Sequence, residues 1–182
     1  MKTLLIILSL STIMVSCRQQ AVERPVFTKI DLSWGNGWTK YISVFIDSTK
    51  NVKVAIDELN KSRLYFNGQL SDTVFTKINH LISQALTQKF EKEIGTPIPD
   101  GSISYVIIES KTNNIESIIF ESGIANKLDT IVNTIIELNN YKLTKIFDST
   151  FVFKSYNAIR PTLCRDTVKF VPPVIKDDVI EK

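Results

Sequence analysis

The sequence predicts an α+β domain in which an antiparallel sheet carries two helices packed on one face. Two observations support this prediction. Segments of alternating apolar and polar residues, typical of half-buried strands, occur between residues 27 and 66 and recur after residue 102. Each group of these segments is followed by one stretch whose apolar residues have helical spacing.

The predicted strands are rich in β-branched and aromatic residues and are separated by polar or glycine-bearing turns. They cover residues 27–32, 41–47, 52–56, 63–66, 103–109 and 115–121, with two closing strands at 151–153 and 167–171. Trp34-Gly35-Asn36-Gly37-Trp38 interrupts the sheet after the first strand. Asn67-Gly68 is a strong turn signal after the fourth, and Asn113-Asn114 predicts the turn of a later hairpin.

Two stretches have the periodicity of amphipathic helices. The first covers residues 71–90, and Ser71 or Asp72 is suited to its N-cap. The second covers about residues 126–139, with Asp129 placed favourably in the first turn. Because each helix has a single apolar stripe, both are expected to pack on the sheet.

Residues 1–16 have the pattern of a secretory signal. A lysine at position 2 precedes an apolar run that is too short to span a bilayer. The run ends at Met14-Val15-Ser16-Cys17, with a small residue directly before a cysteine. This end resembles the bacterial lipobox, Leu-(Ala/Ser)-(Gly/Ala)-Cys. Cys17 matches it, Ser16 fits as a small residue in the place of glycine or alanine, and Met14 and Val15 are looser.

The lipobox resemblance implies that the signal is removed and that Cys17 receives a diacylglycerol thioether and an acylated amino terminus. Two or more acyl chains anchor a protein firmly, at roughly 0.8 kcal/mol per buried methylene. Residues 17–25 would then be the lipid anchor and tether. They contain no acidic run of the kind that some lipoproteins use for surface display, which favours the outer membrane, facing the periplasm. The alternative is an ordinary cleaved signal in which Cys17 is incidental.

Length and composition predict one domain over residues 26–172 and a loose tail at 173–182. The chain has 182 residues, of which 43% are hydrophobic and 23% charged, enough to form a core. The formal net charge is +3, and basic and acidic residues are interspersed. Because no dense basic cluster occurs, we expect no nucleic-acid partner.

The two cysteines and the single histidine restrict the chemistry. If Cys17 is lipidated, Cys164 has no partner within the chain and is free, buried or intermolecular, with a buried structural thiol the expected role. Nothing places His80 beside Cys164, so a Cys–His nucleophile is not predicted. One histidine without a cysteine cluster also does not favour a zinc site.

No pattern typical of catalysis or cofactor binding occurs. Gly-x-Ser-x-Gly, Walker and dinucleotide motifs are absent. Neighbouring acids such as Asp57-Glu58 and Asp177-Asp178 lie in polar stretches, where solvated surface charge is the common case. We therefore predict no enzymatic activity, no catalytic residue, no cofactor and no metal.

Trp34 and Trp38 form the local feature that most favours a binding role. Two large aromatic residues beside a flexible turn can stack on a sugar ring, a peptide or a partner's surface, and Tyr41 would extend that surface. The structural alternative is that both indoles cover the open edge of the sheet or fill one end of the core.

Glycine and aromatic positions between Trp34 and Leu86 also follow a recognisable order. A glycine-bearing turn precedes the strand Tyr41–Asp47, and a later strand ends in Phe66-Asn67-Gly68-Gln69-Leu70-Ser71 before a helix. This order resembles an uncharacterised domain of Bacteroidetes lipoproteins, in which the later strand ends in (Tyr/Phe)-x-Gly-x-(Leu/Ile)-Ser. The resemblance implies a small α+β domain on a lipid anchor and assigns no catalytic residue.

Together these features predict a non-enzymatic, lipid-anchored envelope protein that binds a protein or another envelope component. Two alternatives stay open at this point. One is an envelope hydrolase with an unrecognised site, which would need a pocket of convergent polar groups. The other is a small-molecule carrier, which would need a large apolar cavity between the sheet and the helices.

Overall fold

The computed structural model describes residues 24–37, 39–98, 101–121, 123, 126–147 and 149–164. The signal at 1–16, Cys17, Trp38, the closing strand expected at 167–171 and the tail at 173–182 lie outside the described residues. No helix in the described part of the chain has the length and apolar character needed to cross a membrane.

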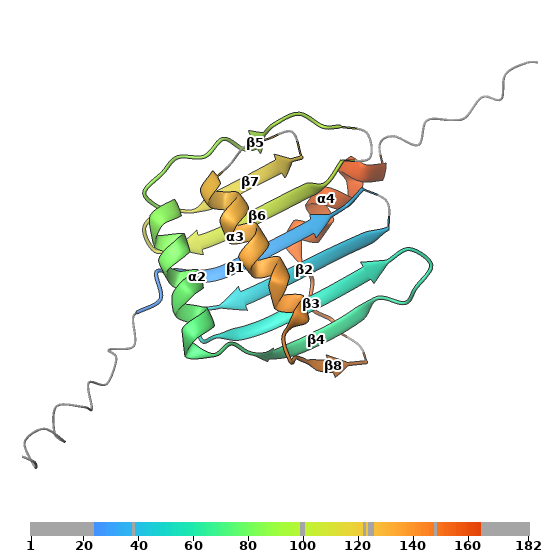
Figure 1. Ribbon diagram of the computed structural model, residues 1–182, viewed down its shortest axis with the longest axis horizontal. Coiled ribbons are helices and arrows are strands. Elements are labelled where there is room, and N and C mark those ends of the chain that lie inside the picture. Colours follow the sequence, from blue (N-terminus) through green and yellow to red (C-terminus); the bar gives the residue numbers. More distant parts are fainter. Residues whose placement is uncertain are drawn as a thin grey trace, which may run out of the picture.

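One sheet of eight strands forms the centre of the domain, in the order β5-β7-β6-β1-β2-β3-β4-β8 (Figure 1). Its strands are β1 (Phe27–Gly35), β2 (Lys40–Asp47), β3 (Asn51–Glu58), β4 (Leu64–Gln69), β5 (Glu93–Ile94), β6 (Ile103–Ser110), β7 (Ile115–Phe120) and β8 (Thr144–Ile146). Every pairing is antiparallel except that of β5 with β7. The first strand of the chain therefore lies inside the sheet, between β2 and β6.

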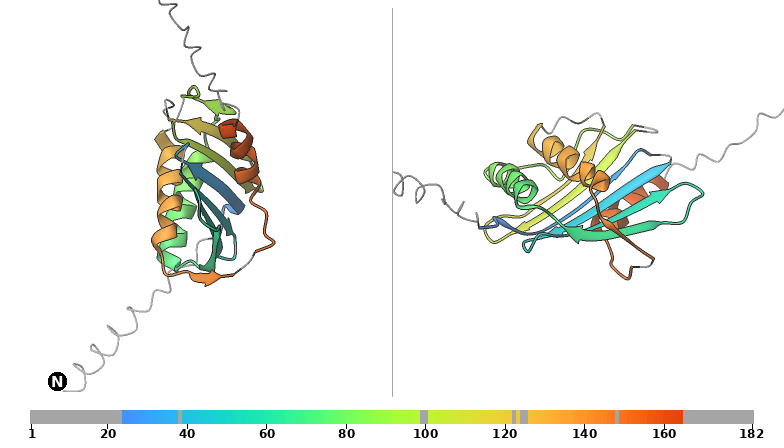
Figure 2. Two further views of the ribbon diagram at one scale, coloured as in Figure 1. Left: turned by 90° about the vertical axis from the view of Figure 1, so that its right-hand side faces the viewer. Right: turned by 60° about the horizontal axis from the view of Figure 1, so that its bottom comes forward.

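Helices cover both faces of the sheet. The two predicted helices are α2 (Asp72–Ala85) and α3 (Asn126–Ile136), which continues into the 3-10 helix η1 (Glu137–Asn140). They lie on the same face, whereas α4 (Lys154–Cys164) lies on the opposite one (Figure 2). The predicted α+β class, with two helices on one face of an antiparallel sheet, is confirmed.

Alternation along the strands builds the main core between the sheet and the α2/α3 face. The strand residues that face these helices are almost completely buried: Ile30, Leu32, Ile42, Val44, Ile46, Val52, Val54, Val106 and Ile108. The helices contribute Phe75, Ile78, Ile82, Leu128, Ile131 and Ile135. The predicted N-cap of α2 is also confirmed, because the Ser71 hydroxyl oxygen accepts the N–H of Val74 at 3.4 Å.

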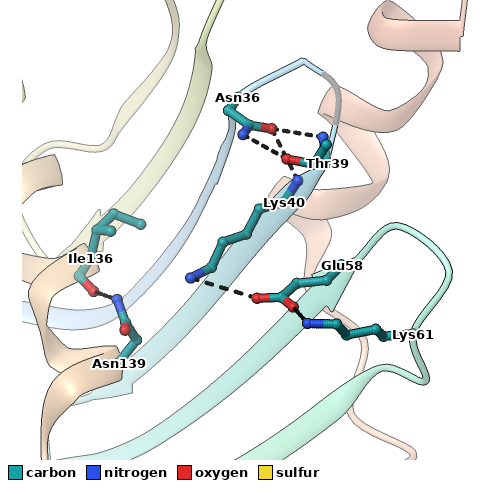
Figure 3. Close-up of polar contacts among 7 residues, drawn as sticks. All are labelled: Asn36, Thr39, Lys40, Glu58, Lys61, Ile136 and Asn139. Carbon is teal, nitrogen blue, oxygen red and sulfur yellow. Dashed lines mark hydrogen bonds and ion pairs between the residues drawn. The ribbon is translucent and has the colours of Figure 1, made fainter.

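The turn after β1 begins later than predicted. Trp34 and Gly35 are the last residues of β1, and the turn is held by Asn36, whose Oδ1 accepts the N–H groups of Thr39 at 2.9 Å and Lys40 at 3.0 Å (Figure 3). This side chain reproduces the hydrogen bonding of a backbone turn. The Trp34 indole is therefore fixed to the sheet.

The predicted turn at Asn67-Gly68 is wrong, because both residues lie inside β4. A Cβ atom at Gly68 would lie 2.8 Å from Cδ2 of Leu143. The glycine therefore permits close packing of the segment that leads into β8, and it does not form a turn.

The predicted strand at 151–153 is also wrong, since these residues form the irregular segment that leads into α4. Phe153 is buried together with Ala55 and Tyr156 on the α4 face. A short aromatic run favours a strand locally, but here it packs against the face of the sheet and does not pair at its edge.

Candidate functional site

Trp34 lines an open cleft of about 280 Å³ between the sheet and α3. We call it the Trp34 cleft. The residues used below are those that line it with aromatic or polar side chains, namely Trp34, Ser102, Ser104, Glu121, Asp129 and Asn133. They come from the end of β1, the start of β6, the residue after β7 and one side of α3.

The strand register explains why the surface is hollow here. Trp34 pairs with Ile42 of β2 and with Ser104 of β6, and Ser104 in turn pairs with Ile119 of β7. Paired residues of an antiparallel sheet point to the same face. A small serine therefore lies between the large side chains of Trp34 and Ile119, beneath the first turns of α3.

Ser104 is the buried polar group of the Trp34 cleft. The residue is 7% exposed, and among the described residues no hydrogen bond reaches its hydroxyl group. Arg63 Nε is the buried side-chain polar atom without a partner in the described part of the chain, so the Ser104 hydroxyl is in contact with the solvent of the cleft, which a ligand that donates to it or accepts from it would replace.

Carboxylate and amide groups surround this hydroxyl. Glu121 accepts the backbone N–H of Ser102 at 2.7 Å, which fixes its carboxylate at the rim. Asp129 and Asn133 lie four residues apart on α3 and therefore face the same side of the helix. Among the described residues, the lining contains the carboxylates of Glu121 and Asp129 and no lysine, arginine or histidine.

The structure separates the aromatic residues that the sequence grouped. Trp38 lies outside the described residues. Tyr41 points to the α4 face, where its ring lies against Gly35 and contacts Tyr156 edge-on at 6.0 Å between ring centroids. Trp34 and Tyr41 therefore occupy opposite faces of the sheet, and the single surface predicted for them is not formed.

A buried polar network on the α4 face was not predicted. Asp31, which is 5% exposed, accepts the N–H of Lys154 at 2.7 Å and a hydrogen bond from the Ser155 hydroxyl. The Ser155 and Ser43 hydroxyl groups each lie 2.7 Å from that of Ser33. Burial raises the pKa of Asp31, while the hydrogen bonds from Ser155 and Lys154 act in the opposite direction. The network fixes the start of α4 on the sheet.

The acidic neighbours Asp57 and Glu58 both have structural partners. Asp57 accepts a hydrogen bond from the Tyr156 hydroxyl at 2.6 Å. Glu58 contacts Lys61 at 2.5 Å and Lys40 at 3.8 Å (Figure 3). The hydrogen bond from Lys61 is the main cause that lowers the pKa of Glu58. The two acids face different partners and do not form a carboxylate pair.

Other residues singled out in the sequence give no site among the described residues. His80 is exposed, and its Nε2 lies 2.9 Å from Nε2 of Gln84. No group of three histidine, cysteine, aspartate or glutamate side chains in the described part of the chain could hold a metal ion. Cys164 is the last residue of α4, and the role of its thiol stays a prediction.

No protein-family model matches the sequence, and no curated protein matches it. The resemblance to the Bacteroidetes lipoprotein domain therefore stays a prediction. The candidate site depends on the geometry of this chain alone, in which the Trp34 cleft combines an aromatic wall with the hydroxyl group of Ser104.

Proposed function

We propose that the protein is a lipid-anchored component of a bacterial cell envelope, and that its domain binds another envelope component through the Trp34 cleft. The observation that carries this proposal is the position of the cleft relative to the point where the chain enters the fold. The two lie at opposite ends of β1, so an anchor before β1 leaves the cleft accessible.

A buried side chain fixes the point of entry. Asn79 of α2 is fully buried. Its Oδ1 accepts the N–H of Val26 at 2.8 Å, and its Nδ2 donates to the carbonyl of Arg24 at 3.3 Å. The chain is therefore held to the domain directly before β1 begins.

The length of the tether would set the orientation of the domain relative to the membrane. An extended chain from Cys17 to Arg24 spans at most about 25 Å, so a lipid on Cys17 would keep this end of the domain close to the bilayer. Trp34 lies about 23 Å further along β1 than Phe27, at about 3.3 Å per residue. The Trp34 cleft would therefore face away from the membrane.

The side chains of the cleft favour binding over catalysis. A nucleophilic mechanism needs a serine, cysteine or threonine within reach of a general base that a third group orients. Ser102 and Ser104 have no histidine or lysine beside them in the described lining. The same side chains provide aromatic contact and hydrogen bonds, which are the requirements of a binding site.

The anchor is tested with a Cys17→Ser variant of the full chain, expressed in a bacterium that processes lipoproteins. We expect labelled palmitate to enter the wild type and not the variant, and we expect the variant to leave the membrane fraction. Palmitate labelling that is independent of Cys17, or no labelling of either protein, would show that this cysteine is not the anchor.

The binding role is tested by site-specific photocrosslinking in living cells. A photoreactive amino acid replaces Asn133, an exposed residue at the cleft, and in the matched control it replaces Lys111, an exposed residue of the β6–β7 hairpin at the opposite end. We expect a defined adduct from position 133 that position 111 does not give and that Ser104→Ala weakens. The same adducts from both positions, or none from position 133, would contradict the proposal.

A further inference from the structure

We propose that the α4 face of the sheet carries a second binding site, for a carboxylate joined to a short aliphatic group. This inference goes beyond the proposed function, since the Trp34 cleft lies on the other face of the sheet. It rests on a cavity with apolar walls and on a half-buried lysine, Lys53, at the mouth of that cavity.

A cavity of about 110 Å³ lies between strands β3, β4 and β8 and the segment that leads into α4. We call it the Lys53 cavity. The strand register explains its lining, because paired residues point to the same face: Lys53 pairs with Asn67, and Tyr65 pairs with Ile146. Phe153, from the segment before α4, is the other large side chain of the lining.

An open depression of about 510 Å³ adjoins the Lys53 cavity. It is lined by Lys53 and by residues 149–152. Lys53 and Ser149 belong to both linings, so they lie where the two spaces meet. A ligand can therefore place one group in the Lys53 cavity and another in the depression, beside the Lys53 ammonium group.

The Lys53 ammonium group favours an anion. Its Nζ lies 4.1 Å from the ring centroid of Phe151, and in the described part of the chain no carboxylate is within ion-pair distance of it. By contrast, Lys50 contacts Asp72 at 2.5 Å. The contact with the ring compensates only part of the hydration that a half-buried ammonium group loses. A carboxylate would add a charge-assisted hydrogen bond.

Arg63 places a second cation behind the walls of the Lys53 cavity. Its guanidinium carbon lies 5.4 Å from the ring centroid of Tyr65 and 5.8 Å from that of Phe153, and its Nε is buried without a hydrogen-bond partner in the described part of the chain. Asp57, on the same face of β3, accepts the Tyr156 hydroxyl at 2.6 Å. The guanidinium steadies the two rings, and its charge adds to the attraction that Lys53 exerts on an anion.

The walls decide the other half of the ligand. Tyr65, Ile146 and Phe153 give the Lys53 cavity large apolar surfaces. An apolar cavity of about 150 Å³ holds benzene, so about 110 Å³ is sufficient for a compact group of roughly four or five carbon atoms.

Only a ligand with both parts uses the whole site. An uncharged aliphatic molecule would fill the Lys53 cavity and leave the ammonium group without an anion. A phosphate would contact the ammonium group and leave the apolar walls in water. A carboxylate that carries a short aliphatic group makes both interactions.

The inference is tested by NMR titration of the full chain, held in phosphatidylcholine nanodiscs if it is membrane-anchored. The signal followed is the δ1 methyl group of Ile146, assigned with an Ile146→Val variant. The main probe is 4-methylpentanoate, and N-acetyl-leucine presents similar groups as the end of a peptide chain. The matched probes are 4-methylpentan-1-ol, which is uncharged, and acetate and inorganic phosphate, which lack the aliphatic group.

We expect a saturable shift of the Ile146 signal with at least one of the two carboxylates at millimolar concentration. The alcohol, acetate and phosphate should each bind about tenfold more weakly or less, because each makes only one of the two interactions. This series tests the inference on the unaltered protein.

A pair of variants tests the charge of Lys53. Lys53→Met should weaken binding of the carboxylate about tenfold or more, since it removes the charge and keeps the length of the side chain. The matched control is Lys145→Met, because Lys145 is an exposed lysine of β8 that pairs with Phe66 and therefore points to the opposite face. It should leave the affinity unchanged.

Three results would overturn the inference. They are a lack of saturable shift with both carboxylates, affinity for the alcohol, acetate or phosphate equal to that for the carboxylates, and equal affinity of the wild type and the Lys53→Met variant. Binding of N-acetyl-leucine supports the inference and identifies the end of a peptide chain as a source of the ligand. Binding of 4-methylpentanoate alone supports it and identifies a free acid.

Discussion

Replacing Asp31 with alanine should loosen α4 from the sheet. The carboxylate accepts the Lys154 N–H at 2.7 Å and a hydrogen bond from the Ser155 hydroxyl, at a position that is 5% exposed. Its removal leaves the first donors of α4 without a partner, which costs about 1–3 kcal/mol for a buried donor. Loss of a helix N-cap costs about 0.5–2 kcal/mol. Because this cost concerns the same N–H groups, it is not added to the cost of the unpaired donors.

Part of this loss is offset, because the variant no longer buries a carboxylate. We therefore expect the free energy of unfolding to fall by about 2 kcal/mol in Asp31→Ala. Asp31→Asn keeps one acceptor oxygen and the same shape, and it should lose about 1 kcal/mol or less. Because asparagine has nearly the same volume as aspartate, the comparison of Asp31→Asn with the wild type tests the hydrogen bonds without a change in side-chain volume.

The free energies of unfolding of the wild type and of Asp31→Asn should also depend differently on pH. Burial is the main cause that raises the pKa of Asp31 above its ordinary value, so ionisation costs more in the folded protein than in the unfolded one. The contribution of Asp31 to stability is therefore complete below the ordinary pKa and declines as the pH rises through the folded pKa. Asparagine does not ionise, so the stability of Asp31→Asn relative to the wild type should rise as the pH rises above the ordinary pKa of an aspartate.

Urea unfolding followed by circular dichroism measures these differences, and an unchanged slope with urea would show that the unfolded states are comparable. Hydrogen exchange adds the location, because the amides of α4 should lose protection while those of α2 keep it. An alanine variant within about 0.5 kcal/mol of the wild type would refute the reasoning, since it would mean that the buried donors do not depend on this carboxylate.

Three further predictions concern the strands. Gly35→Ala should lower the free energy of unfolding by about 1–3 kcal/mol, because its Cβ would lie 2.6 Å from ring atoms of Tyr41; an unchanged urea midpoint would contradict this. Burial raises the pKa of Asp47, but hydrogen bonds from two side chains and two backbone N–H groups of its turn outweigh it and lower the pKa. Asp47→Asn should therefore be less stable than the wild type at neutral pH, and the difference should close as the pH falls through the folded pKa, which unfolding at a series of acidic pH values measures. Burial, with the hydrogen bond to Glu116, raises the pKa of Tyr105 to about 12; Glu116→Gln should lower it, as read from ultraviolet absorbance against a Tyr105→Phe reference, and an unchanged pKa would show that this contact is absent in solution.

The parts of the fold that depend on local pattern were predictable from the sequence. Helices α2 and α3 and most strands follow the spacing of their apolar residues. Strand β5 has two residues and β8 has three, too few to establish a period. Helix α4 contains Pro161, which acts against a helix locally, and its start depends on Asp31, 123 residues earlier in the chain.

The Trp34 cleft depends on contacts that no local pattern contains. The sequence indicated Trp34 correctly as a residue of interest, but it also grouped Trp34 with Tyr41, which the alternation of β1 and β2 places on the other face. Ser104 gave no signal, because its role comes from pairing with Trp34 across two strands that are distant in sequence. Register between strands is a tertiary property, and it decides which side chains meet.

The central position of β1 has a mechanical consequence. Any pull on the chain before Arg24 is directed along a strand that is paired on both sides, with β2 and with β6. Hydrogen bonds in antiparallel pairs run perpendicular to the strands, so such a pull loads two ladders in shear, where the bonds must yield together. A strand at the edge of the sheet would instead present one ladder, which peels bond by bond. The domain is therefore built to withstand force applied at its amino-terminal end.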